Sequence, residues 1–167
     1  GYMRGAIWGL ITMVRQEEDP QIAAGSLSRY LAEAVWVPTA LLPRHGVVWE
    51  GIDEDRARAT LTAGRTTVSV EFRFGKDGLV ESVYMPDRLR DEDGEAVPTP
   101  WEGHFRQYET RDGMLIPVSG EVAWLLEKGR QTYWEGEITA IRYERFPAQT
   151  ASPGAPDDEG HDGRMDR

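Results

Sequence analysis

The chain has no cysteine, few histidines and no long apolar run. None of its 167 residues is Cys, which excludes disulfides, thiolate metal sites and cysteine nucleophiles. The longest nearly apolar stretch, Val35 to Leu42, covers about eight residues and is interrupted by Pro38, whereas a transmembrane helix needs about 20. The sequence therefore predicts no membrane-spanning helix.

Positive charge is also scarce. The sequence has 19 Lys and Arg residues against 29 Asp and Glu, which gives a formal net charge of −10. Such a balance repels phosphate backbones, and no basic run offsets it locally. We therefore expect no nucleic-acid partner.

Sequence signatures of catalysis are missing as well. The histidines, His45, His104 and His161, are far apart, and no H-x-x-H or HExxH pattern for zinc occurs. Neither Gly-x-Ser-x-Gly nor a glycine-rich phosphate loop is present. We therefore expect no metal and no cofactor, assign no catalytic residue, and favour a non-enzymatic protein over an enzyme.

The two ends of the chain have different compositions. Gly1 opens directly into an apolar stretch typical of a strand, which indicates missing upstream residues. Residues 147–167 are rich in Pro, Gly and acid with almost no large apolar side chain, which predicts a disordered tail. No signal peptide is visible near residue 1, which slightly favours the cytoplasm. We predict one antiparallel β domain over residues 1–146, followed by the tail.

One convincing helix is predicted, from Ser26 to Trp36. Its apolar residues recur at helical spacing, and Ser26 is a suitable N-cap. Pro38 disfavours the helical conformation at Val37 and so ends the helix. A helix of about three turns must dock on something to be stable.

Beyond residue 46 the apolar residues alternate, which predicts strands. Glycine and aspartate at short intervals supply the turns between them. The predicted strands are 47–52, 57–61, 66–74, 79–85, 105–108, 114–124 and 133–146. The fold class is therefore α+β, mostly β: a curved, half-barrel-like antiparallel meander of seven or eight strands with one main helix against it.

The predicted strand over 114–124 is long and has one apolar face. Pro117 lacks a ladder donor and belongs at an edge or a bulge, and Gly120 permits a bend. A sheet with one apolar face must cover that face, and one short helix covers only part of it. Either the sheet curls on itself, a second layer is missing, or the concave face holds something apolar.

Aromatic residues are the most informative side chains. Six tryptophans are spread over nearly every element, and three of them precede a glutamate, at 49–50, 101–102 and 134–135. Alternation in a strand predicts Trp inward and Glu outward. The tryptophans either pack the core or line a cavity for a hydrophobic ligand. The candidate ligand-binding residues are Trp36, Leu41, Leu42, Trp49, Trp101 and Trp124.

The run RYLAEAVWVPTALLP, residues 29–43, carries a family resemblance. With VPTPWEGHFRQY, GMLIPVSGEVAWLL and YWEGEITAIRYE, it resembles a bacterial family of unknown function over most of residues 1–144. That family is more distantly similar to lipoprotein carriers of the LolA and LppX type, which are half-barrels with helices on the concave side. The resemblance implies an apolar or lipid-like ligand, upstream residues in front of Gly1, and no known catalytic residue.

Three functional hypotheses follow. The first is a non-enzymatic binding module that holds an apolar, lipid-like ligand on the concave face. The second is a structural or interaction domain whose apolar face packs with a missing upstream segment or with a second copy. The third, which the sequence favours least, is a carboxylate-based hydrolase that needs Glu102 or Glu135 turned inward with a raised pKa.

Overall fold

The computed structural model describes residues 20–144. The predicted N-terminal strand and the predicted tail lie outside the described residues. Helix α2 (Pro20–Glu33) is followed by three short 3₁₀ helices, η1 (Ala34–Trp36), η2 (Pro38–Leu41) and η3 (Pro43–His45). Seven strands then complete the described chain.

Helix α2 begins earlier than predicted. Its first residue is Pro20 and not Ser26, so Ser26 lies inside the helix and is no N-cap. Proline is favoured in a first helical turn, since its missing N–H would have no intrahelical partner there. The α-helical part ends at Glu33, and the predicted remainder up to Trp36 is 3₁₀ helix. Val37, before Pro38, has φ −133° and ψ 67°, outside the helical region as predicted.

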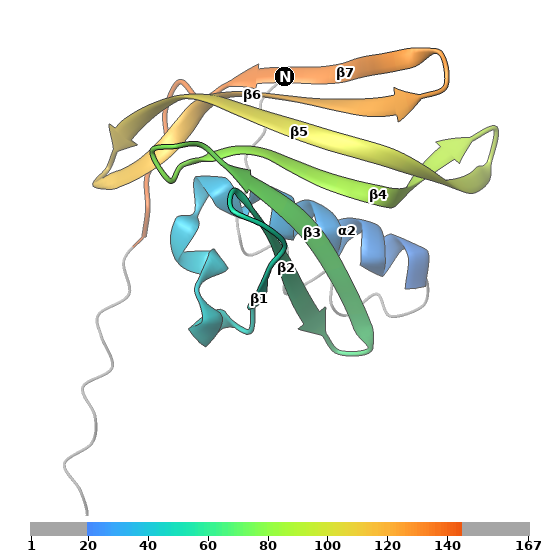
Figure 1. The fold of residues 1–167 in the computed structure, drawn as a ribbon, viewed down its shortest axis with the longest axis horizontal. Coiled ribbons are helices and arrows are strands. Elements are labelled where there is room, and N and C mark those ends of the chain that lie inside the picture. Colours follow the sequence, from blue (N-terminus) through green and yellow to red (C-terminus); the bar gives the residue numbers. More distant parts are fainter. Residues whose placement is uncertain (1–19, 145–167) are drawn as a thin grey trace, which may run out of the picture.

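The strands form one antiparallel meander in which every strand pairs with its sequence neighbours, in the order β1-β2-β3-β4-β5-β6-β7. This open, curved sheet with one main helix confirms the predicted fold class, and Figure 1 shows the sheet bending around α2. The strands are β1 (Val48–Gly51), β2 (Arg56–Ala63), β3 (Thr66–Phe74), β4 (Val80–Glu92), β5 (Glu95–Arg111), β6 (Met114–Leu126) and β7 (Gly129–Glu137).

The core lies between α2 and the sheet face that it covers, which we call the concave face. Helix α2 packs mainly on β3 with further contacts to β2 and β4, and η1 packs on β6. Alternate residues of β3 are buried, and Val70 and Phe72 are fully so, as the sequence pattern predicts. Leu31 of α2 is equally inaccessible and belongs to the same cluster. Burying one such side chain contributes about 1.5–3 kcal/mol.

Three strands differ in extent from their predictions. Strand β4 continues past Met85 to Glu92, through the register shift that contains Pro86. Strand β5 begins at Glu95 and is much longer than predicted. Pro98 and Pro100 are tolerated in it because they lie before the first β5–β6 pair at Trp101 and so remove no bond from that ladder. Strand β7 ends at Glu137 rather than at residue 146. Its last ladder pair is Ser119 with Glu137, and the Ile138 N–H still donates to the Val118 carbonyl at 2.7 Å.

The 3₁₀ segment is tied to the sheet by two indole groups. Trp36 Nε1 donates to the Pro117 carbonyl at 3.0 Å, and Trp49 Nε1 donates to the Leu41 carbonyl at 2.9 Å. The Tyr143 hydroxyl donates to the Trp36 carbonyl at 2.6 Å. These bonds satisfy backbone acceptors that regular secondary structure leaves open.

Candidate functional site

The predicted ligand residues fall into two separate groups. Trp36, Leu41 and Trp49 pack against the core around the 3₁₀ helices, while Leu42 is 40% exposed. Trp36 meets Phe105 edge-on with ring centroids 5.5 Å apart. The aromatic contacts in this first group are therefore made with the chain's own side chains.

The second group is the pair Trp101, which is only 3% exposed and part of the core, and Trp124, which is half-buried and packs against the core. These residues are directly opposite each other on β5 and β6 and so share the concave face. Tyr133 of β7 stacks on Trp124 with ring centroids 5.6 Å apart and 19° between planes. The guanidinium carbon of Arg88 lies over the Trp101 ring, 4.5 Å from its centroid, and 5.7 Å from that of Trp124. We call these four residues the Arg88 cluster.

A β-bulge places Arg88 in this cluster. Met85 pairs with Trp101 and Arg88 pairs with Thr99, so β4 carries one residue more than β5 between these pairs. Simple alternation from Met85 would instead bring Asp87 to this face. Pro86 sits at the irregularity, where a missing ladder donor is tolerated. Bulges redirect side chains in this way next to functional sites.

A second bulge places Tyr133. Val122 pairs with Trp134 and the next residue of β6, Ala123, pairs with Thr132, so Tyr133 is the extra residue on β7. Its hydroxyl accepts a hydrogen bond from Trp101 Nε1 at 2.8 Å. That acceptor role leaves the hydroxyl proton free to donate. The Tyr133 side chain remains 49% exposed, so the cluster is open on this side.

The charge of Arg88 lacks an anionic partner among residues 20–144. Its contacts are with the two indole rings, and no described carboxylate lies within ion-pair distance. Glu33 of α2 is near enough to favour the charged form of Arg88, but its carboxylate forms an ion pair with Arg29 at 2.6 Å. Burial lowers the pKa of Arg88. An arginine that remains charged above pH 12 in water therefore sits half-buried against two indole rings.

The opposite face of β5, β6 and β7 carries a network of ion pairs. Glu102 contacts His104 Nε2 at 3.1 Å and Arg130 Nε at 2.5 Å, and Arg130 also reaches Glu121 at 2.8 Å. Burial acts to raise the pKa of Glu102, but hydrogen bonds from Arg130 and the nearby His104 outweigh it, so the pKa is lowered. A carboxyl held ionised in this way is unsuited to be a general acid.

The other two Trp-Glu repeats also place the glutamate on the outside. Glu50 is highly exposed and Glu135 is exposed, while Trp49 and Trp134 are half-buried. Neither Glu102 nor Glu135 is therefore turned inward, as a carboxylate-based hydrolase would need. In the described ranges, no group of three or more His, Cys, Asp or Glu side chains is placed to hold a metal ion.

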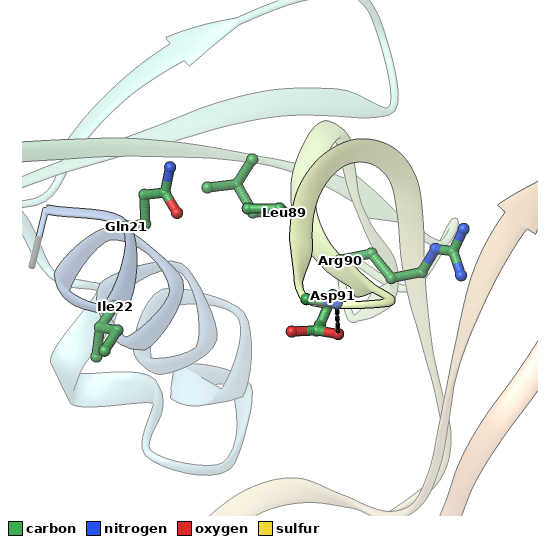
Figure 2. A pocket seen from close by; sticks show the side chains of 7 residues that line it. Gln21, Ile22, Leu89, Arg90 and Asp91 are labelled. Carbon is green, nitrogen blue, oxygen red and sulfur yellow. Dashed lines mark hydrogen bonds between the residues drawn. The ribbon is translucent and has the colours of Figure 1, made fainter.

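A pocket of about 250 Å³ lies between the first turn of α2 and the β4–β5 hairpin. Gln21, Ile22 and Leu89 line it together with residues of the hairpin, and Figure 2 shows Leu89 directed toward α2 while Arg90 points away. Arg90 forms an ion pair with Glu92 at 2.8 Å. None of the predicted ligand residues lines this pocket.

Sequence reasoning missed Arg88 and Tyr133. Both positions depend on bulges, and a bulge reverses the alternation on which strand-face predictions rest. Pro86, a proline within an otherwise regular strand, was the only signal in the sequence that could have indicated the first bulge.

The fold and the cluster define an open, curved antiparallel sheet with an aromatic, arginine-capped patch on its concave face. Comparison with family models then gives the affiliation: the model described as "Family of unknown function (DUF6920)" matches residues 1–143. The chain therefore belongs to this family. No protein with a curated description and no solved structure matches it. Across residues 20–144, no helix has the length and apolar character needed to cross a membrane.

Proposed function

We propose that this protein is a non-enzymatic binding module whose Arg88 cluster holds an apolar, lipid-like ligand on the concave face. The observation that carries the proposal is the cluster itself: the half-buried indole of Trp124 and the stacked, half-exposed Tyr133, beside the buried Trp101, on a face that α2 covers only in part. Aromatic rings give a ligand large contact area at low cost in conformational entropy. The resemblance of the sequence to lipoprotein carriers supports the same proposal.

The proposal places the ligand on fewer of the six residues that the sequence predicts to bind it. Trp124, which is half-buried, and the more exposed Tyr133 supply the accessible surface of the Arg88 cluster, whereas Trp101 is only 3% exposed and belongs to the core. Trp36, Leu41 and Trp49 fix the 3₁₀ segment on the sheet. Leu42, exposed on that segment, is the remaining candidate for contact with a ligand chain.

Native mass spectrometry of the full-length protein purified from its own host tests the proposal. We expect a reproducible apolar mass that organic extraction removes and that Trp124→Ala diminishes. Leu115→Ala is the matched control, because Leu115 lies on the same strand and is 48% exposed. A clean apo mass, together with no binding of a neutral long-chain alcohol to the purified protein, refutes the proposal. A dimer in that case favours the interaction-domain hypothesis.

A further inference from the structure

The Arg88 cluster contains hydrogen-bond donors as well as rings. Arg88 contacts Trp101 and Trp124 through their π-faces, and such contacts leave guanidinium N–H groups available. The Tyr133 hydroxyl is held in place as an acceptor of the Trp101 indole N–H, and its own proton can be donated. The indole pair therefore has a cationic donor and a neutral donor beside it.

The geometry points to an anion-binding position at Arg88 and Tyr133 that takes the carboxylate of a long-chain, fatty-acid-like ligand whose chain lies along the half-buried Trp124 and the exposed ring of Tyr133. This inference rests on the proposed function and adds the head group to it. Arg88 supplies a positive charge for the head group, and the neighbouring aromatic rings supply an apolar surface for the chain. A single-chain amphiphile requires both.

Charge complementarity selects an anion. A half-buried guanidinium with no described carboxylate in ion-pair range is costly to desolvate, and a ligand anion would offset that cost. The bulge at Pro86 is what brings this cation onto an otherwise apolar face. Without that bulge, alternation would put Asp87 there, which would repel an anion.

A singly charged carboxylate fits better than a phosphate monoester. The guanidinium edge matches the two oxygens of a carboxylate and balances one negative charge. A dianionic head group would leave an excess negative charge in a chain whose formal net charge is already −10. We therefore commit to a carboxylate.

Matched probes test the inference: laurate, dodecanol and dodecyl phosphate, titrated into the full-length protein below their aggregation concentrations and followed by tryptophan fluorescence. We expect laurate to bind at least about tenfold more tightly than dodecanol, the scale of one charge-assisted hydrogen bond. Arg88→Met should remove this preference and leave dodecanol binding nearly unchanged. Tyr133→Phe should weaken laurate binding by a smaller factor.

Arg106→Met is the matched control, because Arg106 is an exposed arginine on the opposite face of β5, paired with Glu121. It should change neither affinity. Equal affinity for laurate and dodecanol, a laurate preference that survives Arg88→Met, or tighter binding of dodecyl phosphate overturns the carboxylate site while leaving the proposed function standing. Failure of all three probes to bind overturns both. If Arg88→Met does not fold, Arg88→Gln replaces it, and the ratio of laurate affinity to dodecanol affinity is compared between this variant and the wild type. A ratio that is unchanged in Arg88→Gln overturns the carboxylate site.

Discussion

Trp36 should be the residue on which docking of the 3₁₀ segment depends most. Its indole N–H donates to the carbonyl of Pro117, a fully buried residue, and its ring meets Phe105 and Trp134 edge-on. Trp36→Phe keeps a ring but removes the donor, which leaves a buried acceptor unsatisfied at a cost of about 1–3 kcal/mol. A weakened ring contact with Trp134 adds about 0.5–1.5 kcal/mol.

The combined loss of unfolding free energy for Trp36→Phe is therefore about 1.5–4.5 kcal/mol. Urea denaturation followed by far-UV circular dichroism measures it. With a slope of about 2 kcal/mol/M, the midpoint should fall by about 0.8–2.2 M while the slope stays constant. Phe105→Leu is the control, since it removes one ring contact but leaves the hydrogen bond, and should cost less. A Trp36→Phe loss below about 0.5 kcal/mol would refute the reasoning, because a buried unsatisfied carbonyl costs more.

Three further outcomes are expected. Gly136→Ala should destabilise the fold by about 1–3 kcal/mol in urea denaturation, because its Cβ would lie 2.3 Å from the Trp134 ring, whereas Gly51→Ala, with no atom within 4 Å, should be nearly neutral. Because the pKa of Glu102 is lower in the folded protein than its ordinary value of 4.5, its ionised form stabilises the fold at pH values above 4.5. This stabilisation is lost as the pH falls through the pKa of the folded state. In acid unfolding, Glu102→Gln should therefore make the unfolding free energy depend less steeply on pH. Burial raises the pKa of Tyr108 to about 12, so its stabilising effect is complete below pH 10 and is lost as pH rises through 12; ultraviolet titration should show one late phenol that Tyr108→Phe removes.

Each of these predictions has an outcome that contradicts it. A neutral Gly136→Ala would mean that the Trp134 ring moves away at no cost. An unchanged acid slope in Glu102→Gln would mean that the ion pairs of Glu102 are screened by solvent. If Tyr108→Phe left the late titration intact, the phenol responsible would be Tyr143, whose pKa burial also raises.

Much of the architecture was set by local sequence pattern. The alternation of β3 gave its buried face, because a strand in which every second residue is apolar can bury only one face. Short turns rich in Gly and Asp between successive strands predicted the meander, which the strand order confirms. Pro38 ended the helical region at Val37 as expected, because its ring clashes with a helical residue before it. These outcomes need only interactions between near neighbours in the chain.

Tertiary structure alone decided the rest. Strand β7 ends at Glu137, where its pairing with β6 ends at Ser119, a limit that the sequence of β7 alone does not contain. Trp36 joins the core because a carbonyl of β6, 81 residues away, accepts its indole N–H. Arg88 and Tyr133 reach the concave face because each strand carries one residue more than its partner, and that mismatch exists only between paired strands. The sequence by itself determined which residues could form a site; the register of the sheet determined which of them meet.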